Sequence, residues 1–187
     1  MAHLTLDTLR DGLKAWKGCE LHKTATQAVL GEGNPKAEVM FIGEAPGQKE
    51  DELGRPFVGA AGQFLDELLA SIGLRRADVY ISNVVKYRPP QNRDPTPEEK
   101  EQCMPWLMLE IALIRPKVIV PLGRHALGHF FSKLSITEGH GKPQQLTADV
   151  TVFPIYHPAA ALHNGGLRQS LYDDFKALGE YLKSIQK

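Results

Sequence analysis

Two acidic residues in a glycine-rich segment are candidates for a catalytic role. Glu44 directly follows the apolar run AEVMFIG, and Glu50 lies six residues further on, in the segment GEAPGQKED. The glycines let backbone N–H groups approach a ligand closely, which makes Gly43 a candidate substrate-binding residue. The segment lacks both the Gly-Lys-Ser/Thr of a phosphate-binding loop and the G-x-G-x-x-G spacing of a dinucleotide fingerprint, so nucleoside triphosphates are not expected. Two solvated loop acids are the plain alternative.

Three further residues could contact a ligand: one follows an apolar run, one lies near the end of a run, and one lies in a loop segment. His157 follows VTVFPIY and could donate a hydrogen bond to negative charge that develops on a ligand oxygen. Asn83, in VYISNVV, carries one amide acceptor and two donors, which suits recognition of the polar edge of a base. Phe57, in GRPFVG, could stack on a planar ring. The structural alternatives are a surface histidine, a turn-forming asparagine and an aromatic loop anchor. The histidines lack zinc-site spacing, so no metal is expected.

Alternating strands and helices would bring these side chains to one edge of a sheet. Apolar runs predict strands over 37–43, 79–85, 117–123 and 150–156. Helical patterns lie between them, which predicts an α/β fold with a parallel sheet covered by helices on both faces. In such sheets, ligands bind beyond the carboxyl ends of the strands. The long irregular segments 43–62 and 86–97 both follow a strand, so we expect the functional site there.

Helix boundaries are marked by capping residues. The apolar positions of 61–72 recur with helical period, and Gly73 suits the end of that helix. Thr96 and Glu99 form a capping box for a second helix, with Pro97 at its first position and Pro116 as its stop. Further helices are predicted over 6–16 and 167–185.

Composition limits the function. The 187 residues predict a single domain, and 22 basic residues balance 22 acidic ones. This balance argues against a protein that wraps nucleic acid through a bulk positive field, so any DNA contact must be local. Two cysteines cannot form a disulfide framework. Residues 1–10 carry Asp7 among leucines and do not resemble a secretory signal, and no apolar run reaches the ~18 residues of a membrane span. We therefore expect a cytoplasmic monomer without a membrane partner.

Four long motifs together resemble a known family. GEAPGQKED, GRPFVGAAGQFLDELL, NVVKYRPPQNRDPTPEE and HPAAAL occur in the order and at the separations of the family 4 uracil-DNA glycosylases. The similarity covers about residues 18–178. The resemblance implies a three-layer α/β/α fold around a four-stranded parallel sheet, and excision of uracil from DNA.

The resemblance also implies roles for the residues singled out above. Glu44 and Glu50 correspond to carboxylates that place water and stabilise the cationic sugar. Phe57 corresponds to the residue that stacks on the flipped uracil. Asn83 corresponds to the amide that recognises the uracil edge, and His157 to the donor to uracil O2.

Other residues are expected to contact the DNA itself. Leu162 resembles the wedge that fills the gap left in the duplex. His163 stands where the family usually has an arginine, which weakens a phosphate contact. A basic group would bind a few phosphates of the DNA, and it consists of Lys86, Arg88 and Arg93.

The cofactor of the family is matched only in part. Most members hold a four-iron four-sulfur (4Fe-4S) cluster on four cysteines, and the corresponding positions here are Trp16, Cys19, Tyr87 and Cys103. Because such a cluster normally needs four thiolates, we expect no cofactor, with aromatic packing in its place and two neighbouring free thiols. A stray metal or a bridging disulfide is the alternative.

The expected partner is uracil-containing DNA, as a U·G or U·A duplex or a single strand. One alternative is a sensor of uracil or damaged bases that binds DNA without turnover. Another is a small-molecule nucleoside hydrolase. A related class traps uracil-DNA covalently through a histidine in an insert after the asparagine strand, but segment 86–97 has neither the histidine nor the length.

Overall fold

The computed structural model describes residues 4–185, so residues 1–3 of the N-terminal segment discussed above lie outside it. Its strands are β1 (Glu32–Gly33), β2 (Val39–Gly43), β3 (Tyr80–Asn83), β4 (Val118–Pro121), β5 (Gln144–Gln145) and β6 (Thr151–Val152). Its α-helices are α1 (Leu6–Ala15), α2 (Gln48–Leu53), α3 (Ala60–Ser71), α4 (Pro97–Ile114), α5 (Arg124–Leu127), α6 (Ile136–Gly139), α7 (Pro158–His163) and α8 (Gly166–Ile185). Short 3₁₀ turns cover Glu20–Lys23, Arg76–Asp78 and Pro90–Asn92.

One mixed sheet forms the middle layer, in the order β1-β3-β2-β4-β6-β5. The four central strands are parallel, while β1 and β5 pair antiparallel at the two edges. The predicted four-stranded parallel sheet is thus confirmed as the centre. The edge strands were not predicted, because two residues are too few to show an alternating pattern.

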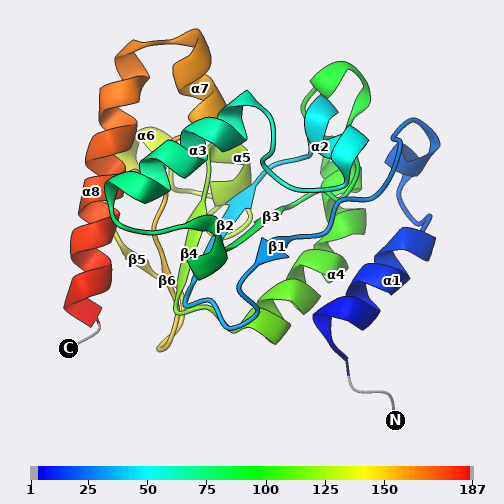
Figure 1. Ribbon diagram of the computed structural model, residues 1–187, viewed down its shortest axis with the longest axis horizontal. Helices are drawn as coiled ribbons and strands as arrows, with labels where there is room; N and C mark the ends of the chain where they lie inside the picture. Colours follow the sequence, from blue (N-terminus) through cyan, green and yellow to red (C-terminus); the bar gives the residue numbers. More distant parts are fainter. Residues whose placement is uncertain (1–3, 186–187) are drawn as a thin grey trace.

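Helices cover both faces of the sheet, which confirms the three-layer α/β/α architecture (Figure 1). Helices α3, α7 and α8 pack together on one face, and α4 packs against β3 on the other, with α1 outside it. Alternate residues of β2 enter the two cores. Phe41 stacks on Phe175 of α8, with ring centroids 5.8 Å apart, whereas Ile42 belongs to the core that contains Leu107 of α4. Burial on both faces explains why the central strands are continuously apolar.

The predicted helix signals are present as expected. Helix α3 is followed by Gly73 at φ +77°, a conformation that favours glycine. The capping box of α4 has both hydrogen bonds: Thr96 N donates to Glu99 Oε2 at 2.8 Å, and Glu99 N donates to Thr96 Oγ1 at 3.3 Å. This helix ends at Ile114, two residues before Pro116. None of the helices in residues 4–185 is long and apolar enough to cross a membrane.

The last strand is much shorter than predicted, yet its continuation positions the site. Pro154 lacks an N–H and interrupts the ladder after β6. Phe153 N and Ile155 N still donate to carbonyl oxygens of Ile119 and Pro121, at 2.8 and 3.1 Å. The segment therefore stays beside β4 and delivers His157 to the carboxyl edge of the sheet.

Candidate active site

A cavity of about 320 Å³ lies at the carboxyl ends of β2 and β3. It is lined by all five side chains assigned to substrate or catalysis from the sequence: Glu44, Glu50, Phe57, Asn83 and His157. Its other walls come from the segments 45–47 and 92–95 and from Ala61, Pro89 and Ala159. Segments far apart in the chain thus bring one amide, one imidazole, one phenyl ring and two carboxyl groups together.

The amide of Asn83 is the buried polar group that points most clearly to a ligand. Its residue is 2% exposed, and its Oδ1 has no hydrogen-bond partner among the described residues. Leaving such an acceptor unpaired costs about 1–3 kcal/mol, so the site suits a ligand that supplies an N–H donor.

Gly43 is not among the residues that line the cavity, and its predicted contact with substrate stays a prediction. A Cβ at this position would lie 2.4 Å from Asn83 Oδ1 and 2.6 Å from Phe57 Cζ. Glycine is therefore needed here because both neighbouring side chains occupy the space that a side chain would take.

Lys86 was predicted to contact DNA, and this is wrong. Its side chain is fully buried and forms an ion pair with Glu110 of α4. It also donates to Ser82 Oγ at 2.9 Å and to the main-chain oxygen of Asn83 at 2.7 Å. The side chain turns inward because the Glu110 carboxylate neutralises its charge. Glu110 shares a helix face with the buried Leu107 and Ile114, and that spacing was the available signal.

The loop that carries Phe57 is held from two sides. Glu50 Oε1 accepts hydrogen bonds from Val58 N and Gly59 N, both at 2.8 Å. Arg76 donates to the Phe57 carbonyl oxygen at 2.8 Å. These bonds stabilise a left-handed backbone at Phe57, φ +51°, which is costly for a bulky residue. The phenyl ring is thereby fixed over the cavity, 5.7 Å from the His157 ring at an interplanar angle of 29°.

His157 is held as a neutral hydrogen-bond donor. Its Nδ1 accepts from Ala159 N at 3.1 Å, in the first turn of α7. Burial lowers the pKa of this histidine to about 4, although the nearby Glu50 charge acts in the opposite direction. With Nδ1 as the acceptor, the proton of the neutral ring is on Nε2. The cavity therefore contains one N–H donor without positive charge at neutral pH.

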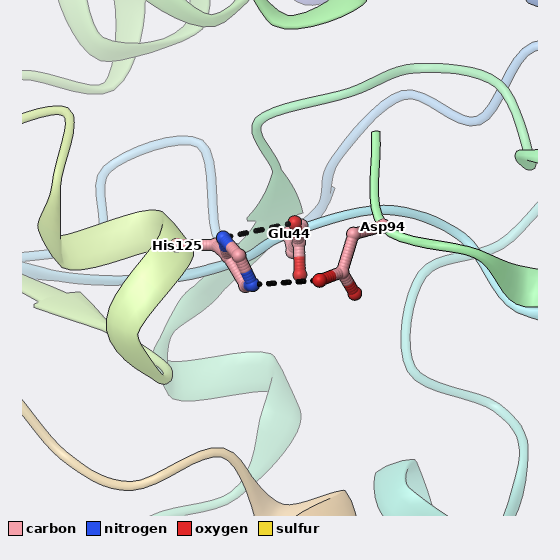
Figure 2. Close-up of side chains that lie close together, drawn as sticks. All are labelled: Glu44, Asp94 and His125. Atoms are coloured by element: carbon pink, nitrogen blue, oxygen red, sulfur yellow. Dashed lines mark ion pairs between the residues drawn. The ribbon is translucent and has the colours of Figure 1, made fainter. Parts of the chain in front are cut away.

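Glu44 has charged neighbours that the sequence did not indicate. Burial raises its pKa, while His125 and Lys100 lower it and Asp94 raises it. Figure 2 shows the His125 ring paired through one nitrogen with the carboxyl group of Glu44 and through the other with that of Asp94. His125 lies in α5, directly beyond β4, so the rule that ligands bind past strand ends could have found it.

Comparison with known proteins decides the family. A model of the uracil DNA glycosylase superfamily matches residues 30–183. The chain belongs to this superfamily. A type-4 uracil-DNA glycosylase of Archaeoglobus fulgidus is 50% identical, with 94% of this chain and 92% of the relative aligned. Type-4 enzymes of Sulfurisphaera tokodaii and Thermotoga maritima are 49% and 43% identical, covering 94% and 95% of this chain and 84% and 95% of theirs. The predicted resemblance is confirmed.

Four residues remain that were expected to contact DNA. Arg93 lines the cavity, but its guanidinium donates to both carboxylate oxygens of Glu99, at 2.8 and 2.6 Å. Arg88 is half-buried and donates to Asn92 Oδ1 at 2.7 Å. Leu162 is 46% exposed, and His163 next to it is also exposed, at the end of α7. Their contacts with DNA stay predictions.

The iron–sulfur cluster implied by the family 4 resemblance does not fit the donors of this chain. Cys19 and Cys103 are buried in the same core and each affects the pKa of the other, which confirms their predicted proximity. Trp16 stacks on Tyr87 with centroids 5.8 Å apart, and the Tyr87 hydroxyl donates to the Trp16 carbonyl oxygen. Burial raises the pKa of Cys103 to about 12, so its thiolate is disfavoured. Two thiols packed against two aromatic rings cannot supply four thiolate ligands.

Proposed function

We propose that this chain excises uracil from DNA by hydrolysing the N-glycosidic bond and leaving an abasic site. The observation that carries the proposal is the pairing, in one cavity, of an unsatisfied amide oxygen on Asn83 with a neutral histidine donor on His157. Membership of the uracil DNA glycosylase superfamily supports the same chemistry.

The amide of Asn83 matches uracil in both directions of hydrogen bonding. Its Oδ1 accepts from uracil N3–H, and its NH₂ group donates to O4. Cytosine presents an acceptor at N3 and a donor at N4, so it would leave buried groups unpaired at about 1–3 kcal/mol each. Phe57 provides the ring on which the flipped base stacks. Flipping is least costly for a mispaired base, which favours uracil opposite guanine.

Bond cleavage separates charge across the cavity. The leaving uracil takes the electron pair of the C1′–N1 bond and becomes an anion, while positive charge develops on the deoxyribose. His157 Nε2–H stabilises the anion at O2, and the Glu44 carboxylate stabilises the sugar cation and orients the attacking water. Water then bonds to C1′ and gives its proton to the Glu44 carboxylate, while uracil leaves as the anion. Glu50 contributes by fixing the Phe57 loop, since its Oε1 is occupied by two backbone N–H groups.

The proposed enzyme works without an iron–sulfur cluster. The fold around Cys19 and Cys103 is completed by the Trp16–Tyr87 stack, which occupies the region of the missing ligands. Protein purified without oxygen should therefore lack stoichiometric iron and the broad absorbance near ~400 nm of such a cluster. Iron at cluster stoichiometry would refute this part of the proposal.

Release of uracil from labelled oligonucleotides tests the activity. U·G duplex, U·A duplex and single-stranded substrates should each give an abasic product that alkali cleaves. Binding without product would favour the sensor instead. Cleavage of free deoxyuridine, with no preference for DNA, would favour a nucleoside hydrolase.

A further inference from the structure

A charged network contacts Glu44 from the side opposite the base. Lys100, on α4, places Nζ 3.4 Å from Glu44 Oε1 and 3.4 Å from His125 Nδ1. His125 Nδ1 lies 3.5 Å from the same Glu44 oxygen, and its Nε2 lies 3.1 Å from Asp94 Oδ2. Figure 2 shows the two contacts of the imidazole. Three separate segments thus converge on one catalytic carboxylate.

Lys100 and His125 do not border the base cavity. Neither Lys100 nor His125 lines the base cavity, whereas His125 lines a neighbouring cavity of about 280 Å³ on the other side of Glu44 and His157. Lys100 is 17% exposed and His125 is 28% exposed, so both are partly removed from solvent. They therefore act on Glu44 rather than on a flipped nucleotide.

The same cluster has donor atoms close enough together for a metal ion, since those of Glu44, Asp94 and His125 lie within 4.8 Å of one another. The position of the cluster beside Lys100 nevertheless disfavours a metal ion. The ammonium group of Lys100 is already 3.4 Å from both Glu44 Oε1 and His125 Nδ1. A positive charge at that distance repels a second cation.

We propose that Lys100 and His125 are positioning residues that orient the Glu44 carboxylate toward the base cavity and keep it ionised for uracil excision. The inference rests on the proposed function. Asp94 acts in the opposite sense, because it is a second negative charge on the same imidazole. The balance of these groups sets the lowest pH at which Glu44 can stabilise a cationic sugar.

Electrostatics supports this role. Burial raises the pKa of Glu44, and among its neighbours His125 and Lys100 lower that pKa whereas Asp94 raises it. The charged or titratable groups that face Glu44 include Lys100 from α4, His125 from α5, Asp94 from the preceding loop, and Glu50 and His157 across the cavity. Arg124 of α5 adds a positive charge beside the same network, since it donates to His125 Nε2 at 3.1 Å and lies 3.8 Å from Asp94 Oδ2. Without Lys100, a half-buried carboxylate would lose an opposite charge at 3.4 Å, and it would therefore take up a proton at higher pH.

The test is the pH profile of single-turnover uracil release. Lys100→Met should move the acidic limb upward by about 1–3 pH units, as expected when a neighbouring opposite charge is removed. Its rate should approach that of wild type at alkaline pH, and KM for DNA should change less than kcat. His125→Gln should move the limb in the same direction, and Asp94→Asn should move it downward. Lys100→Arg should restore the wild-type profile.

Lys117→Met is the matched control. Lys117 is an exposed lysine that forms an ion pair with Glu38 at 2.6 Å, next to the amino end of β4 and therefore at the sheet edge opposite the cavity. The Lys117→Met variant loses the same charge as Lys100→Met, and the acidic limb of its pH–rate profile should coincide with that of wild type.

Titration of the Glu44 carboxyl carbon by ¹³C NMR separates this inference from the proposed activity. The signal is assigned by its loss in Glu44→Gln, and its midpoint should rise in Lys100→Met whether or not uracil is released. An unchanged midpoint would overturn the proposal. So would a loss of rate that is equal at every pH and is not rescued by Lys100→Arg, because that pattern indicates a purely structural role. A wild-type protein that releases no uracil would instead contradict the proposed function.

Discussion

Two groups of buried polar side chains meet at Asn83 and differ in whether their atoms are satisfied. Behind the strand end lies the Lys86 cluster, which we define as Lys86, Glu110, Ser82 and Tyr80. The Glu110 carboxylate pairs with Lys86 and accepts hydrogen bonds from Ser82 Oγ at 2.7 Å and Tyr80 OH at 3.1 Å. In front lies the base cavity, where Asn83 Oδ1 has no hydrogen-bond partner among residues 4–185.

The satisfied group stabilises the fold and the unsatisfied group serves ligand binding, although both contact the same short strand. A buried network whose members are all paired stabilises the fold and leaves nothing for a ligand to bind. A cavity with an unpaired acceptor carries a cost in the free protein that a matching ligand removes. Asn83 belongs to both groups, because its main-chain oxygen accepts from Lys86 while its side chain faces the cavity.

Breaking the Lys86 cluster should have the largest effect. Glu110→Ala leaves the Lys86 ammonium buried without a counter-charge, so the free energy of unfolding should fall by about 3–5 kcal/mol. Urea denaturation followed by circular dichroism measures this. The control is Glu38→Ala, which removes an exposed partner of Lys117 and should cost about 0–1 kcal/mol. Equal losses in the two variants would contradict the assignment.

Removing the donor in the cavity should affect rate rather than stability. His157→Ala deletes the Nε2–H that stabilises the uracil anion, so the single-turnover rate should fall by about 100- to 1000-fold while the protein stays folded. His22→Ala, a change to a histidine outside the cavity, should keep the wild-type rate. A His157→Ala enzyme with near-normal turnover would remove this residue from the mechanism.

Changing the amide should alter which base is preferred. Asn83→Asp replaces a donor and acceptor pair by acceptors, which suits the N4 amino group of cytosine, and the preference should shift by about 1–3 kcal/mol toward that base. Competition between uracil- and cytosine-containing oligonucleotides measures the shift. Asn34→Asp, on a different loop, should leave the preference as it is in wild type. An unchanged preference in Asn83→Asp would contradict the edge-recognition role.

The smallest effect is expected at the aromatic pair of Trp16 and Tyr87, which does not line the cavity. Tyr87→Phe removes the hydroxyl that donates to the Trp16 carbonyl but keeps the ring stack, so the free energy of unfolding should fall by about 1 kcal/mol. The rate of uracil release should stay at the wild-type level. Thermal denaturation and the oligonucleotide assay test the two parts. A large loss of activity would mean that this region communicates with the cavity.

Local signals in the sequence were sufficient for most of the fold. The capping box at Thr96 and Glu99 and the glycine after α3 depend on neighbours within a few residues, and both were found correctly. The five cavity residues were also found, because the carboxyl ends of parallel strands meet at one edge. The two-residue edge strands β1 and β5 were missed, since their pairing depends on partners distant in the chain.

The environment of each charged group, by contrast, depends on the tertiary structure. The sequence identifies Lys86 as a basic residue in a loop-rich segment, but whether it meets DNA or Glu110 depends on α4 packing behind β3. The same holds for Glu44, whose contacts with Lys100 and His125 join residues 56 and 81 positions away. Apolar spacing and capping residues therefore determined the fold and the residues around the cavity, and the four motifs indicated the family. Burial and long-range pairing, which no local pattern encodes, decided which charged groups serve the fold and which serve the chemistry.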